Sequence, residues 1–490
     1  MGTASRSTAA PATMPQSLRA ALHLLPAAAT VVGVAVLLRL VYEPWFLNYD
    51  ARYALVWARD IATGLTPDYT GPYAPTPHPL ETVVSLVAVP FGEGGDAIMV
   101  WLVLLCFGVL VWLAYRLGAE LFSPSVGVVA ALVVLTRPAL ERDALLGYQD
   151  TPFAVLIAWA VLIEARRPRS GAPVLALLAV AGLMRPEAWA LAGLYALYVW
   201  RGASRRERVL YAGLTALAPA LWALMDWLVT GDALHSLHGT AALAETVDRR
   251  RDPLTGPYWT AKYLGYTLRE PLVVGIPIGL VFAYRRRLRG AVLPLAVTAA
   301  MLAVFLAGPL FGLPLIGRYV RTPAVLLALF YGLAVFGWRM LPAGPDRRRW
   351  AMAGVVAAAL SVAFLPWHAK LLSSLDDRLA FQGAYYRDLR EVGRAPAVRA
   401  ALKGCGPAAT ADHRPIPHLR WWLDGDPGSV APVADRAARG SRLLLLPRRT
   451  RQMRRFYRDN FPAATRPAGA QLLYRNASWR VFAAQGCARR

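Results

Sequence analysis

The chain has 490 residues, of which 56% are hydrophobic and only 17% are charged, and its mean hydropathy is +0.38. This composition excludes a string of soluble domains and suits a protein that crosses a lipid bilayer many times. The formal net charge of +24 comes from short basic clusters between apolar runs, so membrane topology explains it better than a nucleic-acid partner does.

The N-terminal segment 1–17 is rich in Ala, Ser, Thr and Pro, which predicts a disordered cytoplasmic tail. The apolar run 18–41 is too long for the core of a signal peptide, and we interpret it as a retained signal anchor. A helix needs about 20 apolar residues to span the bilayer. About eleven candidate spans lie near 18–41, 96–115, 124–137, 147–164, 172–184, 187–200, 208–229, 271–284, 290–309, 321–338 and 350–367.

Basic clusters on alternate connections indicate how these spans are oriented. The opposite connections hold most of the loop carboxylates. Because cytoplasmic loops carry an excess of Lys and Arg, we expect a multi-pass plasma-membrane protein with a cytoplasmic N-terminus and everything after His368 outside. The basic clusters lie at 116, 166–169, 201–208, 285–289 and 347–349.

Two regions on the expected outer side are long. The first external loop, 42–95, contains two amphipathic stretches that predict helices lying along the membrane interface. The segment 369–490 alternates helical and strand-like runs, which predicts a small extracytoplasmic α/β domain. Its helical runs are 381–402 and 451–460, and its strand-like runs are 442–446 and 479–483. Cys405 and Cys487 flank this domain and form a disulfide if it is extracytoplasmic, or else they are two unpaired thiols.

Ionisable residues near span ends are the candidate site, because an unpaired charge at membrane depth is costly. Asp50 directly follows the first span and either accepts a proton from a hydroxyl or simply caps the helix that begins there. Guanidinium groups bind phosphate well, although snorkelling or an ion pair explains any single arginine equally. Two further clusters on the outer face comprise Arg185 with Glu187, and Arg318 with Tyr319 and Arg321.

Other residues are weaker candidates. His78 lies between two prolines that hold it extended, either to present the imidazole into a cleft or to start the next helix. Tyr148 and Asp150 lie near the start of the fourth span. His235 and His238 have the spacing of two metal ligands on a helix, but no third ligand is evident, so we predict no metal site.

Three strings in this order resemble the GT-C superfamily of membrane glycosyltransferases, which includes protein O-mannosyltransferases, aminoarabinose transferases and arabinofuranosyltransferases. They are NYDARYALVWARDIATG at 48–64, RPEAW at 185–189 and GRYVRTPA at 317–324. The resemblance covers about 18–368 and implies a polytopic GT-C fold followed by a soluble appendage at 369–490. Many members have adjacent acidic residues at this point of the first loop, whereas here Asn48 and Tyr49 precede the single Asp50, so the sequence does not support a divalent metal cofactor, and none is assigned.

This resemblance implies transfer of a sugar from a polyprenyl-phosphate donor to a glycan, lipid or protein hydroxyl on the outer face. Asp50 is the expected base, and one base acting by direct displacement predicts inversion at the anomeric carbon. The donor phosphate is assigned to Arg318, Arg321 and Tyr319, and the pocket to Arg185, Glu187, His78, Asp150 and Tyr148.

Two other function classes stay open. A transporter or lipid flippase would place charges midway through its spans and show two related halves, whereas Asp226 is the nearest such charge and no internal repeat is evident. An envelope glycan ligase or polymerase would centre on Arg and His in a late loop. The sequence contains neither a Walker motif nor a Rossmann fingerprint for a nucleotide.

Overall fold

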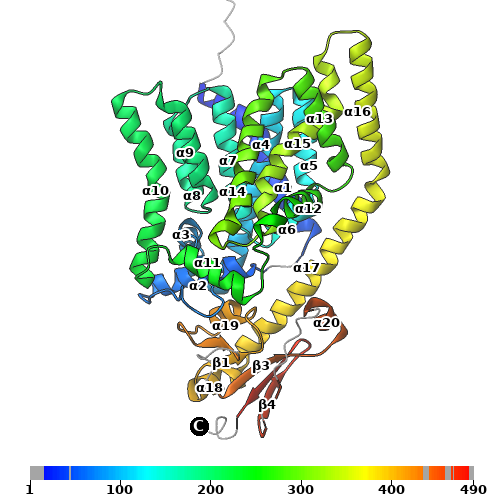
Figure 1. Ribbon diagram of the computed structural model, residues 1–490. Helices are drawn as coiled ribbons and strands as arrows, with labels where there is room; N and C mark the ends of the chain where they lie inside the picture. Colours follow the sequence, from blue (N-terminus) through cyan, green and yellow to red (C-terminus); the bar gives the residue numbers. More distant parts are fainter. Residues whose placement is uncertain (1–15, 44–45, 434–440, 458–464, 467, 485–490) are drawn as a thin grey trace, which may run out of the picture.

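The structure, a computed structural model, describes residues 16–43, 46–433, 441–457, 465–466 and 468–484. A bundle of roughly parallel helices stands above a smaller part that contains a five-stranded sheet (Figure 1). The bundle helices are α1 (Gln16–Val41), α4 (Gly95–Leu121), α5 (Pro124–Leu135), α7 (Asp150–Arg166), α8 (Ala172–Gly182), α9 (Glu187–Trp200), α10 (Arg205–Thr230), α13 (Leu272–Arg285), α14 (Val292–Ala307), α15 (Arg321–Phe336) and α16 (Pro345–Ala363).

These bundle helices coincide, within several residues at each end, with the predicted spans. By length and apolar composition, four helical segments among the described residues are able to cross a bilayer, and counting three bent helix pairs raises this number to seven. The four are Val89–Leu121, Arg205–Thr230, Arg289–Phe311 and Gly317–Met340. A polytopic helical protein is therefore confirmed, and the full set of eleven crossings stays a prediction.

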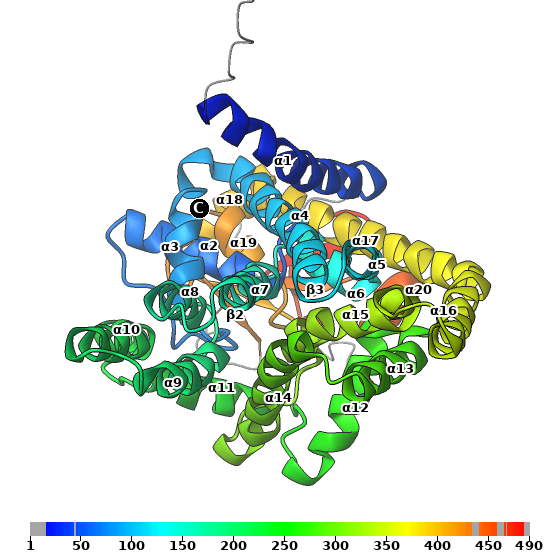
Figure 2. The same cartoon turned by 90° about the horizontal axis from the view of Figure 1, so that it is seen from above.

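Helix α15 forms the centre of the bundle. Seen along the bundle, α4, α5, α7 and α15 lie in the middle, whereas α10 and α16 lie at the edge (Figure 2). Nearly every residue of α15 is buried, but only four residues of α10 are. The close approach of α13 to α15 depends on Gly279, because a Cβ there would overlap the carbonyl oxygen of Phe330.

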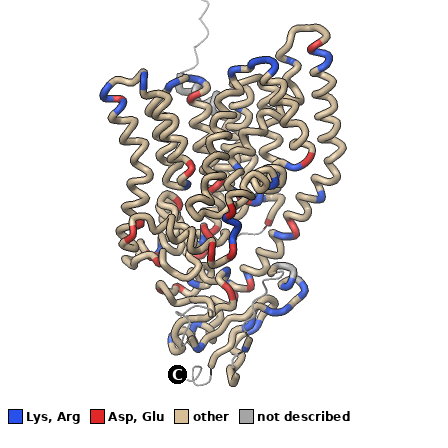
Figure 3. Tube along the Cα trace, in the orientation of Figure 1, with Lys and Arg blue, Asp and Glu red and all other residues tan. Residues whose placement is uncertain are grey.

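The basic clusters gather at one end of the bundle. Figure 3 shows Lys and Arg concentrated on the connections that lie farthest from the sheet. The predicted alternation of charged connections therefore corresponds to the two ends of a real helical bundle. Which end faces the cytoplasm stays a prediction.

Short helices fill the connections at the other end. Helices α2 and α3 lie in the first long loop, where two helices are expected. Most of α2 is buried on all sides, because it is enclosed between the bundle and the sheet-containing part (Figure 1). The connecting elements are α2 (Tyr49–Ala62), α3 (Pro79–Leu86), η1 (Val89–Gly94), α6 (Pro138–Leu145), α11 (His235–Thr246), η2 (Pro253–Thr255), α12 (Gly256–Leu268), η3 (Arg289–Ala291), η4 (Gly308–Phe311), η5 (Gly317–Val320) and η6 (Gly337–Met340).

Helix α17 (Leu365–Arg394) connects the bundle to the C-terminal part. It follows α16 after a bend of 46° and continues for 30 residues until Pro396 interrupts it. Helices α18 (Pro396–Cys405), α19 (Ile416–Trp422) and α20 (Arg451–Tyr457) surround the sheet. Helix α19 packs against α2, where the buried Arg420 donates a hydrogen bond of 2.6 Å to Asp60.

The sheet has the strand order β2-β1-β3-β5-β4. Strands β2, β1 and β3 are parallel, whereas β3, β5 and β4 are antiparallel neighbours. The strands are β1 (Ala408–Thr410), β2 (Val430–Pro432), β3 (Leu443–Pro447), β4 (Gln471–Arg475) and β5 (Trp479–Ala483). Strands β3 and β5 match the two predicted strand-like runs, which confirms a small C-terminal α/β unit. Cys487 lies outside the described residues, so the disulfide with Cys405 stays a prediction.

Candidate active site

Asp50 lies in the first turn of α2, but it is not the cap of that helix. The cap is Asn48, whose side-chain oxygen accepts hydrogen bonds from the backbone N–H groups of Asp50 and Ala51 at 2.9 and 3.2 Å. The capping alternative for Asp50 is therefore wrong, because Asn48 already satisfies those donors. The Asp50 carboxylate instead accepts a hydrogen bond of 2.5 Å from Nη2 of Arg318.

Arg318 brings several of the predicted residues together. It lies in η5, directly before α15, and its Nη1 is 3.9 Å from Oδ2 of Asp150. Its guanidinium also lies over the ring of Tyr148, with its central carbon 5.0 Å from the ring centroid. Asp50 belongs to α2, whereas Tyr148 and Asp150 lie together at the start of α7, so this one side chain joins the first loop to the bundle.

The turn between α8 and α9 holds the second cluster. Arg185 is buried and forms ion pairs with Asp150 and with Glu187, the latter at 2.6 Å. The Arg185 guanidinium lies 4.2 Å from the centroid of the Tyr319 ring. Asp150 therefore sits between Arg185 and Arg318, and four of the five predicted pocket residues, all except His78, form one continuous network with Arg318.

Arg321 faces a different direction from Arg318. Its Nε donates a hydrogen bond of 2.8 Å to Asp143, and its Nη1 donates another to the hydroxyl of Thr267. Arg321 and Asp143 are both buried, and neither lines the cavity beside Asp50. The structure thus separates two arginines that are three residues apart in the sequence.

A cavity of about 320 Å³ opens beside Asp50. Its walls include the predicted residues His78 and Tyr148, and also Arg142 and Arg249, which we did not predict. In the part of the chain that the structure describes, neither of these two arginines has a carboxylate within ion-pair distance. Arg142 donates a hydrogen bond of 3.3 Å to the hydroxyl of Tyr148, so its charge is oriented without being neutralised.

The C-terminal part completes the cavity. Helix α17 contributes Tyr386, and the segment between β1 and α19 contributes His413. The His413 ring stacks on Tyr73 of the first loop, with centroids 4.9 Å apart and an interplanar angle of 10°. Tyr49, next to Asp50, meets the same imidazole edge-on at 5.4 Å. The first loop and the C-terminal part therefore form one wall together.

Burial and charge set different protonation states around Asp50. Burial alone would raise the pKa of Asp50, but the charge and hydrogen bond of Arg318 hold it below its usual value, so the group is a carboxylate. Burial, followed by the charge of Asp50, raises the pKa of nearby Glu81 to about 8. Burial lowers the pKa of His78 to about 3, so its imidazole is neutral. Two neighbouring acids thus differ in charge at pH 7, an arrangement typical of catalytic sites.

The histidine pair of the second long loop has other partners. His235 Nε2 lies 3.1 Å from the carbonyl oxygen of Tyr69, and His238 Nδ1 lies 2.7 Å from Oδ2 of Asp232. Among the residues that the structure describes, no three His, Cys, Asp or Glu side chains are grouped to hold a metal ion.

No protein-family model matches the sequence, and no curated protein matches it either. Among solved structures, the chain is similar to the aminoarabinose transferase ArnT from Cupriavidus metallidurans bound to undecaprenyl phosphate, with 14% identity and a TM-score of 0.57. This match covers 96% of this chain and 100% of ArnT. ArnT in the apo state matches with 15% identity and a TM-score of 0.54, over 95% and 98% of the two chains.

The oligosaccharyltransferase of Archaeoglobus fulgidus, tethered to an acceptor peptide, matches with 12% identity and a TM-score of 0.49, over 85% of this chain and 64% of that one. The likeness to ArnT extends over both chains almost from end to end, and it includes the C-terminal part as well as the bundle. The chain therefore has the fold of the GT-C membrane glycosyltransferases, as its three sequence motifs predict.

Proposed function

We propose that the protein transfers a sugar from a polyprenyl-phosphate donor to a hydroxyl acceptor, with Asp50 as the base. The observation that supports this most directly is one cavity that combines the Asp50 carboxylate with Arg142 and Arg249, two guanidinium groups that form no ion pair with any of the described residues. A base and a phosphate site are the two components that such a transfer needs. The undecaprenyl phosphate bound to ArnT, which has the same fold, supports the polyprenyl class of donor.

The donor phosphate is best accommodated by Arg142, Arg249 and Arg318. Arg142 and Arg249 line the cavity without an ion pair in the described part of the chain. Arg318 is not part of the cavity lining, but it donates a hydrogen bond to Asp50, which is. Guanidinium groups bind phosphate oxygens bidentately and stay charged when partly desolvated. Arg321 is less suitable, because Asp143 and Thr267 already occupy its donors.

The other predicted residues support these groups rather than touch the substrate. Arg185 and Glu187 hold Asp150 in the network, and Tyr319 packs against the guanidinium of Arg185. Asp150 in turn lies near Arg318, so its charge helps to keep that side chain in place. His78 is neutral and lines the cavity, where it is able to donate or accept a hydrogen bond without adding charge.

The reaction follows from these positions. The acceptor oxygen loses its proton to the Asp50 carboxylate and bonds to the anomeric carbon, while the bond from that carbon to the phosphate oxygen breaks. The leaving phosphate takes the electron pair, and the arginines stabilise its charge, so no general acid is needed. Because donor phosphate competes with Asp50 for Arg318, donor binding also releases the base from its ion pair. One displacement inverts the anomeric centre.

The residues that line the cavity come from α2, from α17 and from the segment after β1, and so belong to the end of the bundle that carries the C-terminal part. The basic connections lie at the other end (Figure 3). We place this end outside the plasma membrane, with the N-terminus in the cytoplasm, because positive connections face the cytoplasm. In this arrangement the membrane domain spans 18–368, the external domain spans 369–490, and the acceptor arrives from outside.

The test is transfer from a radiolabelled polyprenyl-phosphate sugar by the purified protein, comparing wild type with Asp50→Asn. We expect the variant to lose at least a hundredfold in rate, the lower range for a general base. Asp377→Asn, on the exposed side of α17, is the matched control and should retain wild-type rates. Equal activity in wild type and Asp50→Asn would remove the proposed base. Movement of the labelled lipid across a vesicle without release of polyprenyl phosphate would favour the flippase alternative.

A further inference from the structure

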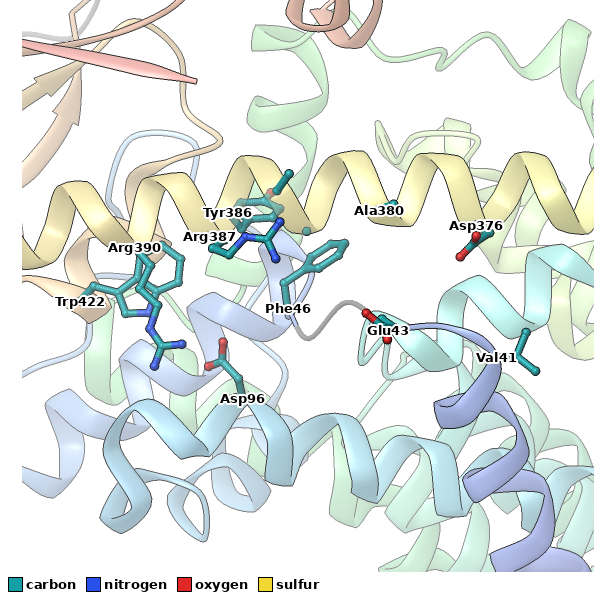
Figure 4. A pocket seen from close by; sticks show the side chains of 12 residues that line it. Val41, Glu43, Phe46, Asp96, Asp376, Ala380, Tyr386, Arg387, Arg390 and Trp422 are labelled. Atoms are coloured by element: carbon teal, nitrogen blue, oxygen red, sulfur yellow. The ribbon is translucent and has the colours of Figure 1, made fainter. Parts of the chain in front are cut away.

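A second cavity, of about 530 Å³, lies beside the first. It is enclosed by α17 on one side, and by the α1–α2 connection and the start of α4 on the other (Figure 4). Its volume falls within the range of ordinary small-molecule sites. Phe46 and Tyr386 line both this cavity and the cavity of Asp50, and their ring centroids are 5.2 Å apart. One aromatic pair therefore forms part of the wall that the two cavities share.

The sequence of α17 creates the open space. The residues that face the cavity recur every three or four positions, which places them on one side of the helix. Asp376 stands at one end of this stripe and Arg387 with Arg390 at the other, and Ala380, Gly383 and Ala384 lie between them. Eleven residues of helix rise about 16 Å. Between the charged ends, the side chains of Ala380, Gly383 and Ala384 are too small to fill the space beside α17, which leaves the cavity open.

The charges of this cavity are mixed and largely unpaired. Within the described residues, Glu43, Asp376 and Arg387 form no ion pair although all three line the cavity. Asp96 uses one carboxylate oxygen to bind Arg52, and its other oxygen is buried without a hydrogen-bond partner. Unsatisfied buried oxygens are uncommon and often mark a place where another molecule binds.

These groups suit a neutral glycan. Three acids and two arginines line the cavity, so neither an anionic nor a cationic ligand meets charges of one sign, whereas a sugar hydroxyl both donates to carboxylates and accepts from guanidinium groups. The rings of Phe46 and Trp422 add apolar surface to the lining. On the basis of the proposed function, we propose that this cavity binds the acceptor, a neutral glycan whose terminal hydroxyl reaches Asp50 past the Phe46–Tyr386 pair.

Saturation-transfer difference NMR on the purified full-length protein tests the site directly. The probes are three trisaccharides that differ in charge: neutral maltotriose, acidic trigalacturonate and the cationic glucosamine trimer. We expect maltotriose to give the strongest signal. Asp376→Asn should weaken its binding about tenfold, because it removes a hydrogen bond to a charged group, and Ala380→Trp should abolish binding by filling the cavity.

Asp377→Asn is the matched control, because this neighbouring exposed carboxylate does not line the cavity. Thermal melting checks that each variant is folded. Preferred binding of a charged trisaccharide, or unchanged maltotriose binding in both Asp376→Asn and Ala380→Trp, would overturn the proposal.

The failure of this site and the failure of the enzyme assignment give different results. If the protein binds maltotriose through Asp376 but consumes no polyprenyl-phosphate sugar, the glycan site is supported and the transferase assignment is refuted. If the Ala380→Trp variant transfers sugar at the wild-type rate, the transferase assignment is supported and the glycan site is refuted. Asp50→Asn should bind maltotriose normally, because Asp50 lines only the other cavity.

Discussion

Replacement of Glu81 by Gln should stabilise the protein at neutral and alkaline pH. Glu81 is 6% exposed, and burial followed by the charge of Asp50 raises its pKa from 4.5 to about 8. At pH 7 the native protein therefore keeps a proton that the unfolded chain has released. The pH of 7 lies 2.5 units above the unfolded pKa of 4.5, and each pH unit in this range costs about 1.4 kcal/mol. The free energy of unfolding is therefore lower by roughly 3 kcal/mol at pH 7 than at acid pH.

The sign of the effect is definite. Because the folded pKa is raised, the contribution of Glu81 is fully present below pH 4.5 and is lost as the pH rises to about 8. Gln is neutral throughout and has no such loss. The melting temperature of Glu81→Gln minus that of wild type should therefore be smallest at pH 5 and increase up to pH 8.

The assay is tryptophan fluorescence during heating of the detergent-purified protein at several pH values. Glu245→Gln, an exposed replacement of the same type on α11, is the control and should follow wild type at every pH. A melting-temperature difference between Glu81→Gln and wild type that stays flat from pH 5 to 8, or decreases, would refute the reasoning about the buried carboxyl group.

Three further predictions concern other parts of the site. Arg249→Gln should raise the KM for the donor about tenfold or more through loss of a charge-assisted hydrogen bond; an unchanged donor KM in steady-state kinetics would exclude Arg249 from the phosphate site. Asp143→Asn should lower the free energy of unfolding by roughly 3–5 kcal/mol, because buried Arg321 loses its partner; a wild-type melting temperature would contradict this. Burial holds the pKa of His413 at about 4, so its contribution to stability is complete above pH 6.5 and is lost as the pH falls toward 4. His413→Phe keeps a ring against Tyr73 and should melt with a weaker dependence on pH over this range; an identical pH dependence would rule out His413 as the source.

The sequence predicts the helices well because their signal is local. Each bundle helix stands out in the sequence as an apolar run, and β3 and β5 are short apolar strands bounded by polar residues. The environment of α2 could not be predicted in this way. Its buried faces contact α19, which lies more than 350 residues later in the chain, and no periodicity within α2 reveals that partner.

Part of the candidate site was also predicted, because some of its residues have a local sequence signal. Asp50, Arg185 and Arg318 stand out as charges beside apolar runs, and the structure joins them through Asp150. The directions of Arg318 and Arg321 depend instead on which neighbours each side chain reaches. Arg142 has a visible signal, because it lies beside Asp143 in the short connection between two candidate spans, but His413 has none, since only the folded chain brings the C-terminal part to the cavity.

The uninterrupted course of α17 has a consequence for how this protein tolerates changes in length. Its first turns follow the bundle, and its later turns supply Tyr386 to both cavities. One extra residue in its first half would turn everything beyond it by about 100° around the helix axis and advance it by about 1.5 Å. The tyrosine would then leave the shared wall, and α19 would lose its packing against α2. Between the bundle and Tyr386, therefore, only insertions close to a whole number of helical turns preserve the alignment of the bundle with the C-terminal part.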